Sequence, residues 1–381
     1  MTPGEPAPDV FASEFCQNPY PAYQALREFN PVYLDPRRKL WVISRYADVR
    51  RVLQTSVEFS ARSASFEHTL LGVDGDAHAR VQRIVSRNLI ENLGTLKQFV
   101  DVCVNAIVSR MADQRRGEIV GDLATYLPVS VAMELLGIDE SSRDIVSRCA
   151  EAIADAGNEL VSDNERAILR RQWDEFRVFL EGHFSRRRER DGLTLDCLFG
   201  DEGGLAPGER VDLGMLLMAA ATQTTTGLIA SAVRIMLSDL SIFQSLRRDA
   251  SLISLFLEEV LRYEPPVQRR RRTVVRETEI SGQPLPAGSE LLVLIGAANR
   301  DAEKFTDADS FVVNRQPNDH LSFGFGAHRC LGRALSRIEA VAAITALVER
   351  LDALALSDPA EIVQHRQNLV IRSPLQLKVV C

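Results

Sequence analysis

From Leu213 to Val233 the chain contains no charged residue, and this run is the strongest constraint on what it can fold into. A helix of this length and composition could cross a membrane. The middle of the run argues against that, because five consecutive polar residues lie there, Thr222 to Thr226, and because Asp212 and Arg234 close the run. We therefore predict a helix buried through the centre of a large water-soluble fold.

A glycine-rich loop surrounds Cys330, in the segment FGFGAHRCLGRALSRIE. Gly324, Gly326 and Gly332 allow positive φ and close backbone approach, so they predict a tight loop. Apolar residues then recur at helical spacing, which places Cys330 where a loop becomes a helix. The free N–H groups at a helix start favour a thiolate, which serves as a nucleophile or a metal ligand. The alternative is a buried, inert cysteine.

The pattern Phe-Gly-x-Gly-x-His-x-Cys-x-Gly, followed by Leu-x-Arg, resembles the haem-ligand loop of the cytochrome P-450 superfamily. The resemblance implies that Cys330 is the proximal ligand of a haem b iron and that Phe323 packs beside its sulfur. It also implies that His328 binds a haem propionate. Gly324 would shape the same loop, and Gly332 would let the helix lie close to the porphyrin.

The uncharged run resembles the long central helix of the same family, whose usual motif is Ala-Gly-x-(Asp/Glu)-Thr. Small Ala220 would leave room for dioxygen, and Thr224 would contact it; the alternative for Thr224 is a bond back to the carbonyl four residues earlier. Gln223 replaces the usual carboxylate, and an amide cannot accept and release a proton near neutral pH. Protons would then arrive through water or from the substrate, or the enzyme would leak peroxide, or the reaction would be an atypical oxidation such as coupling or ring formation.

Glu259 and Arg262 lie one helical turn apart and precede Pro265-Pro266, which is the family's arrangement upstream of the cysteine loop. Arg315 falls where the family has the third member of a buried ion group. Such a group needs all of its partners, because one unpaired buried charge costs several kcal/mol. The resemblance therefore implies a structural role for these three residues.

Four arginines follow Gln268 at the start of a β-rich stretch, and their plain interpretation is a solvated charge run. The resemblance implies instead that Arg272 binds a haem propionate, as a guanidinium can with two parallel bonds. Alternation along a strand places Arg270 on the same face, where it would pair with an acidic group of the substrate. Val267 and Leu369, the latter near the turn of a final hairpin, would also line the substrate pocket.

A second helix carries a further implied propionate contact, His78, for which the alternative is a solvated residue in a helical first turn. The sequence departs from the family pattern at two more positions. Gln82 stands where the family usually has an arginine, and Ser336 where it usually has alanine.

Length and composition agree with this interpretation. The 381 residues are 45% hydrophobic, and the net charge of −7 argues against a nucleic-acid partner. The six cysteines are scattered, which is typical of a reducing cytoplasm, and no apolar anchor begins the chain, so no membrane partner is expected. We predict one mainly α cytochrome P-450 domain over 1–381, with a small β-rich lobe at roughly 30–60 and 265–320, and haem between the central helix and the Cys330 helix.

The implied function is a haem-thiolate monooxygenase that oxidises a small secondary metabolite with O2, using electrons from NAD(P)H through ferredoxin reductase and ferredoxin. Its thiolate would favour O–O cleavage. Arg329, Arg333 and Arg337, at i, i+4 and i+8, would dock the acidic ferredoxin. Two alternatives remain: a haem-binding recruitment module without oxygenase activity, and a peroxide-driven oxidase that needs no ferredoxin.

Overall fold

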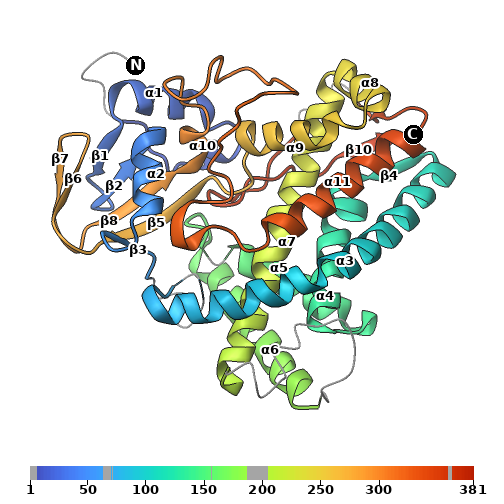
Figure 1. The fold of residues 1–381 in the computed structure, drawn as a ribbon, viewed down its shortest axis with the longest axis horizontal. Helices are drawn as coiled ribbons and strands as arrows, with labels where there is room; N and C mark the ends of the chain where they lie inside the picture. The colour runs from blue at the N-terminus through green and yellow to red at the C-terminus, as the bar shows by residue number, and fades with distance from the viewer. Residues whose placement is uncertain (1–6, 63–69, 71, 156, 187–204, 359–362) are drawn as a thin grey trace.

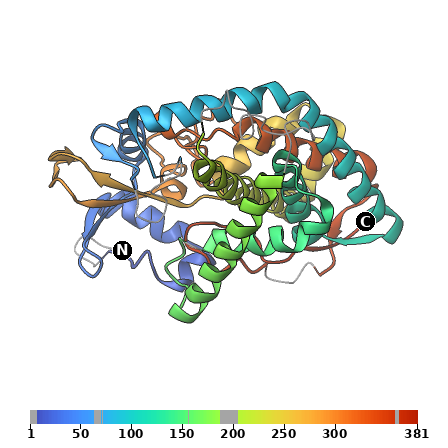
Figure 2. The same ribbon diagram turned by 90° about the horizontal axis from the view of Figure 1, so that it is seen from below.

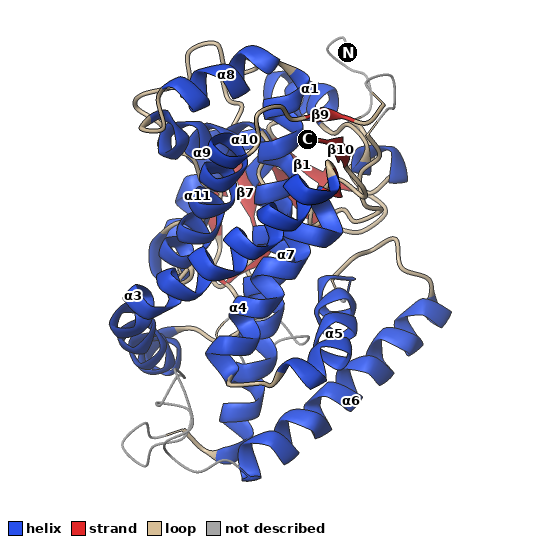
Figure 3. Cartoon of the chain, turned by 90° about the vertical axis from the view of Figure 1, so that its right-hand side faces the viewer, coloured by secondary structure: helices blue, strands red, loops and turns tan. Residues whose placement is uncertain are grey.

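The structure is a computed structural model that describes residues 7–62, 70, 72–155, 157–186, 205–358 and 363–381. Helices make up most of it, and the larger sheet lies to one side of them (Figures 1 and 3). The α-helices are α1 (Tyr20–Phe29), α2 (Tyr46–Gln54), α3 (Gly75–Gln114), α4 (Tyr126–Leu136), α5 (Arg143–Asp155), α6 (Asp163–Arg186), α7 (Pro207–Ser238), α8 (Leu240–Arg248), α9 (Leu252–Tyr263), α10 (Ile295–Ala298) and α11 (Arg333–Arg350). Shorter helical turns are η1 (Ser13–Cys16), the π-helical η3 (Ile119–Thr125), η4 (Glu140–Ser142) and η7 (Gly326–His328).

Helix α7 contains the uncharged run and passes through the middle of the helical part (Figure 1). Pro207 begins it, and the Glu209 carboxylate accepts the Ala206 N–H at 2.8 Å, so the helix start is capped. Two helical segments are long and apolar enough to cross a membrane, Ile119–Leu136 and Pro207–Ser238. Both are mostly buried inside the fold, as core helices are. The prediction of a buried central helix is confirmed.

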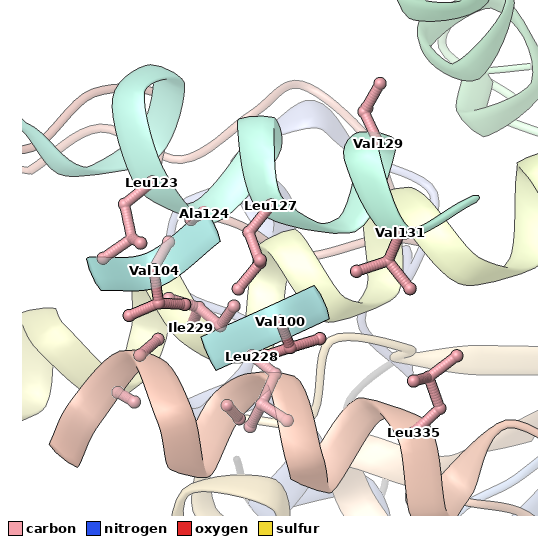
Figure 4. Packing of buried hydrophobic residues seen from close by; sticks show 14 of the residues in the cluster. Val100, Val104, Leu123, Ala124, Leu127, Val129, Val131, Leu228, Ile229 and Leu335 are labelled. Carbon is pink, nitrogen blue, oxygen red and sulfur yellow. The ribbon is translucent and has the colours of Figure 1, made fainter. Parts of the chain in front are cut away.

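The main apolar core forms where α3, α4 and α11 pack around α7. Val100 of α3, Leu127 of α4, Leu228 of α7 and Leu335 of α11 belong to one buried cluster (Figure 4). Seen from below, α3 lies on one side of α7, and α5 and α6 lie on the other (Figure 2). The core thus fixes the position of α7, which contains Gln223, relative to α11, which follows Cys330.

A five-stranded sheet contains strands from two distant parts of the chain. Its order is β1 (Val32–Asp35), β2 (Leu40–Ile43), β8 (Glu290–Leu294), β5 (Arg269–Val274) and β3 (Phe59–Ser60). Strands β2 and β8 pair in parallel, and the other neighbours pair antiparallel. The hairpin of β6 (Thr278–Ile280) and β7 (Gln283–Leu285) extends beside it. All of these strands fall in the two ranges expected to be β-rich.

A three-stranded sheet was not predicted. It joins β4 (Arg116–Glu118), β10 (Lys378–Val380) and β9 (Ala355–Leu356) in the order β4-β10-β9. In the region of the expected final hairpin, one isolated bridge, His365↔Pro374, joins the two arms, and a second, Val267↔Ile371, ties this segment to the residues after α9.

Candidate active site

The loop before Cys330 is tight, and two of its glycines are required by the backbone. Gly324 and Gly326 have φ of +67° and +72°. A Cβ on Gly326 would lie 2.7 Å from the Leu53 carbonyl oxygen at the end of α2, so only glycine lets the loop pack there. The Cys330 N–H donates to the Phe323 carbonyl at 2.8 Å, and α11 begins three residues later.

The Cys330 side chain is exposed, yet the surrounding protein is dense enough for burial to raise the pKa of its thiol. The Gly332 N–H and the charges of Arg270, Arg333 and Arg337 act in the opposite direction. Burial outweighs them, so the helix start alone does not produce the thiolate that the sequence pattern suggested. A bound cation at the sulfur would reverse this balance, because thiolate is the form that binds metal.

Three of the residues expected to bind propionates lie together. The rings of His78 and His328 are 4.2 Å apart, and Arg272 is close enough to His328 to lower its pKa further. Burial is the main cause that lowers the pKa of both histidines and brings that of Arg272 to about 10. Asp74, at the start of α3, accepts from His328 Nε2 at 2.7 Å. His328 is therefore already engaged on one nitrogen, a contact that the sequence did not indicate.

Gln82 and Ser336, the two positions that depart from the family pattern near Cys330, both form hydrogen bonds between helices or loops. Gln82 of α3 donates to the Ala327 carbonyl at 3.0 Å and so ties α3 to the Cys330 loop. Thr225 of α7 donates to the Ser336 hydroxyl of α11 at 3.2 Å. An alanine at position 336 could not make this second bond.

In the middle of α7, Ala220 is exposed although the residues around it are largely buried. The Thr224 hydroxyl donates back to the Ala220 carbonyl at 2.9 Å, the local bond that the sequence left open as its alternative role. Gln223 is 5% exposed, and its Oε1 accepts from Arg366 Nη1 at 3.3 Å. Arg366 also bonds Asp155 at 2.8 Å.

The four arginines of β5 have different environments. Arg271 is exposed and pairs with Glu159 and Glu290, each at 3.0 Å, whereas Arg269 is buried and donates to the Val10 carbonyl. The Arg270 side chain is half-buried and forms no hydrogen bond or ion pair with any residue that the structure describes, and burial lowers its pKa. Its charge also acts on the Cys330 thiol, which places it near that group.

The two apolar residues expected at the substrate are buried. Val267 is 7% exposed and packs in the cluster around the five-stranded sheet, and Leu369 is 2% exposed and packs against the N-terminal segment that contains Phe11. Their contact with a substrate stays a prediction.

Glu259, Arg262 and Arg315 form one ion group. Arg262 donates to both Glu259 oxygens, at 2.7 and 2.8 Å, and both side chains are fully buried. Arg315 Nε lies 3.0 Å from Glu259 Oε1. Arg262 also donates to the carbonyls of Asn299, Ala308 and Ser310, so the group fastens α9 to two later segments.

The sequence profile of the cytochrome P-450 family matches residues 135–379, more than half of the chain. The chain belongs to the cytochrome P-450 family. Cytochrome P-450 109 of Bacillus spizizenii is 32% identical over 93% of this chain and 89% of its own length. The 6-deoxyerythronolide B hydroxylase of Saccharopolyspora erythraea is 31% identical, with 96% of each chain covered.

Solved structures confirm the mainly α cytochrome P-450 fold. One, solved in complex with an acyl carrier protein bearing hexadec-9Z-enoic acid, has a TM-score of 0.90 at 27% identity, covering 97% of this chain and 99% of its own. Another, from Bacillus megaterium and bound to testosterone, has a TM-score of 0.89 at 27% identity, with 97% and 99% covered. The enzyme class follows: this cytochrome P-450 is a monooxygenase, and its family uses haem, dioxygen and reducing electrons.

The residues around Cys330 fit a haem. The thiol supplies a soft ligand for iron, and His78, His328 and Arg272 supply donors for two carboxylates. A Cβ on Gly332 would have only Cys330 Sγ near it, at 4.0 Å, so glycine here is not needed to avoid another part of the protein. That Gly332 leaves room for a haem stays a prediction.

Sequence reasoning missed Asp74, Asp155 and Arg366. Asp74 was readable as an N-cap residue before α3, but its bond to His328 spans 254 residues. Arg366 and Asp155 lie in segments without a recognisable motif, 211 residues apart. No local signal in the sequence could have paired them.

Proposed function

We propose that this cytochrome P-450 holds haem b through Cys330 and oxidises a small, anionic secondary metabolite in the cytoplasm. The observation that carries the substrate class is Arg270, a half-buried cation whose side chain has no hydrogen-bond or ion-pair partner among the described residues and which lies near the Cys330 thiol. A charge in that position is costly unless an anion meets it. One bacterial relative is named as a 6-deoxyerythronolide B hydroxylase, which supports a small-molecule substrate.

In this proposal Cys330 binds the iron, and Arg272, His78 and His328 bind the propionates. Phe323 and Gly324 shape the loop, and Phe323 also lies under the Arg337 guanidinium at 4.5 Å. When bound, the haem supplies activation of dioxygen, with electron density from the thiolate favouring O–O cleavage.

On the other side, Ala220 leaves space beside α7, and Thr224 offers its hydroxyl lone pairs while its proton is bonded to Ala220. Gln223 cannot pass a proton, since a carboxamide neither gains nor loses one near neutral pH. We infer that protons reach this side through water or from the substrate. The same absence of an acid is also consistent with an atypical oxidation, such as coupling or ring formation.

Electrons come from NAD(P)H through a reductase and an acidic ferredoxin. Arg329 and Arg333 lie beside the Cys330 loop, and Arg333 donates to the Cys330 carbonyl at 3.0 Å. Arg337, expected in the same docking stripe, is instead bonded to both Glu258 oxygens, at 2.6 and 2.8 Å. The docking proposal therefore rests on Arg329 and Arg333.

The test is a binding screen on the haem-loaded enzyme. Candidate carboxylic acids and their methyl esters are titrated, and the Soret shift gives the Kd of each. We expect acids to bind and esters to bind poorly, and Arg270→Met to weaken acids roughly tenfold to a hundredfold, the loss of one charge-assisted hydrogen bond. Arg271→Met, next in sequence and exposed, is the matched control and should leave the Kd unchanged.

Two outcomes would overturn parts of this proposal. Equal binding of acids and esters would remove the anionic substrate class, and loss of haem from Arg270→Met alone would assign Arg270 to a propionate instead. A ferrous carbonyl complex without the red-shifted Soret band of a thiolate ligand would remove Cys330 as the ligand. Product formation with hydrogen peroxide at the rate seen with NAD(P)H and ferredoxin would favour the peroxide-driven alternative. Absence of product under both conditions would favour the non-oxygenase module.

A further inference from the structure

Three side chains from three elements form a chain of hydrogen bonds that ends at Gln223. Arg366 donates through Nη1 to Gln223 Oε1 at 3.3 Å and through Nη2 to Asp155 Oδ2 at 2.8 Å. Asp155 is the last residue of α5, Gln223 lies in the middle of α7, and Arg366 belongs to the C-terminal segment. We call these three residues the Gln223 clamp.

The chemistry of Arg366 determines which way the Gln223 amide points. A guanidinium has only donors, so the atom that faces it must be the amide oxygen. The amino group of Gln223 is therefore directed away from Arg366, and it has no acceptor among the described residues. The Gln223 side chain is only 5% exposed, yet its amino group is not one of the fully buried polar atoms that lack a partner, so an acceptor from outside the protein can reach it.

Arg366 is itself held in place. The second oxygen of Asp155 accepts from Asn368 Nδ2 at 2.7 Å, and the Arg366 N–H donates to the Ser373 carbonyl at 3.0 Å. The connection after α5 is fastened to the same segment, because Asn158 Nδ2 donates to the Gln367 carbonyl at 2.8 Å. Arg366 and Asp155 are 25% and 23% exposed, so their ion pair is largely shielded from water.

We propose that Arg366, held by Asp155, is a positioning residue that fixes the Gln223 carboxamide beside Thr224 and directs its amino group to an oxygen acceptor of the substrate or of an ordered water. The clamp thereby gives position 223 the role of a fixed hydrogen-bond donor. This inference rests on the proposed function for its kinetic consequences, whereas the contacts themselves do not depend on it.

The proposal changes what restoring an acid at position 223 should do. A glutamate there would place its carboxylate on Arg366 and form an ion pair instead of a free acid. We expect Gln223→Glu alone to leave the pH profile of coupled turnover unchanged and Gln223→Glu with Arg366→Met to add a new acidic limb. If the single variant already adds that limb, the clamp does not control position 223.

The contacts are tested by unfolding, without turnover. In a double-mutant cycle of Gln223→Ala and Arg366→Met, measured by urea unfolding, we expect losses of stability that are not additive, as for residues in direct contact. Additive losses would overturn the contact. Should Arg366→Met fail to fold, Asp155→Asn replaces it, since it leaves the guanidinium in place but unheld.

The positioning role is tested by coupling. We expect Arg366→Met to lower product formed per NAD(P)H about tenfold, within the range for a displaced active-site group, and to raise peroxide release. Arg366→Lys should recover part of the loss. A weaker substrate Kd in Arg366→Met identifies the acceptor as substrate, and an unchanged Kd identifies it as water.

Arg177→Met is the matched control. Arg177 of α6 also forms an ion pair with α7, to Asp212 at 2.6 Å, but Asp212 lies eleven residues before Gln223 in that helix. If Arg366→Met forms as much product per NAD(P)H as this control, the proposal is wrong. Failure of the proposed function is seen separately, since the unaltered enzyme would then neither bind haem through thiolate nor form product.

Discussion

At the scale of single residues, Glu339 carries a buried carboxyl group with an oxygen that has no hydrogen-bond partner among the described residues. It lies in α11, is 1% exposed, and its Oε2 has no partner among the described residues. Burial raises its pKa well above the ordinary value of 4.5. The carboxyl is therefore neutral over a range of pH in which an exposed glutamate is charged.

This gives a prediction for stability against pH. Because the folded protein holds the Glu339 proton more tightly than the unfolded chain does, its contribution is fully present below pH 4.5 and is lost as pH rises towards the folded pKa. Glutamine is neutral at every pH, so we expect the stability of Glu339→Gln not to fall in this way. The free energy of unfolding of the variant should therefore rise relative to that of the unaltered protein as pH rises. Urea unfolding at a series of pH values measures this.

The matched control is Glu349→Gln in the same helix, where the side chain is exposed. Its stability curve should run parallel to that of the unaltered protein. A parallel curve for Glu339→Gln as well would show that the Glu339 carboxyl is charged and solvated.

At the scale of elements, the Cys330 loop and the end of α2 pack backbone against backbone. Gly326 has its positive φ and a neighbour, the Leu53 carbonyl oxygen, that would lie 2.7 Å from an added Cβ. Gly75, at the start of α3, has a similar φ of +65° with nothing within 4 Å. Comparing the two glycines therefore separates two effects of an added Cβ: backbone strain, which both share, and a steric clash, which occurs only at Gly326.

We predict that Gly75→Ala costs about 1 to 2 kcal/mol, the strain of a left-handed residue, and that Gly326→Ala costs roughly 2 to 5 kcal/mol, since overpacking adds to it. Chemical denaturation of both variants measures the difference. Equal losses would mean that the loop can move away from α2. Gly326→Ala should also weaken haem retention, because the displaced loop carries Cys330.

The sequence predicted elements best where one motif contains its own partners. Glu259 and Arg262 are one turn apart, and the Cys330 loop is read from ten neighbouring positions, so both were predictable. The bond of Thr225 to Ser336 spans 111 residues, and that of Gln223 to Arg366 spans 143. Such contacts depend on how helices pack, which no local pattern specifies; the pairing of β4 with β10 escaped prediction for the same reason.

At the scale of the whole molecule, charge opposes the proposed electron donor. The net charge of −7 repels an acidic ferredoxin, so encounter depends on local positive charge beside Cys330. Arg333 is engaged with the Cys330 carbonyl and Arg337 with Glu258, whereas Arg329 is exposed and lies next to Cys330.

We predict that Arg329→Glu slows reduction by an acidic ferredoxin about tenfold at low salt and that the difference shrinks as ionic strength shortens the Debye length. Stopped-flow reduction at several salt concentrations measures it. Arg170→Glu, an equal charge change at an exposed site of α6, is the control. The same slowing in both variants would point to net charge alone and remove the docking site.

The bond between Thr225 and Ser336 has a consequence for attempts to improve this enzyme in the laboratory. Randomised libraries at position 336, in the helix that follows Cys330, would also loosen Thr225, the direct neighbour of Thr224. Screens for altered product profiles should therefore recover substitutions at Ser336, which act through its bond to Thr225.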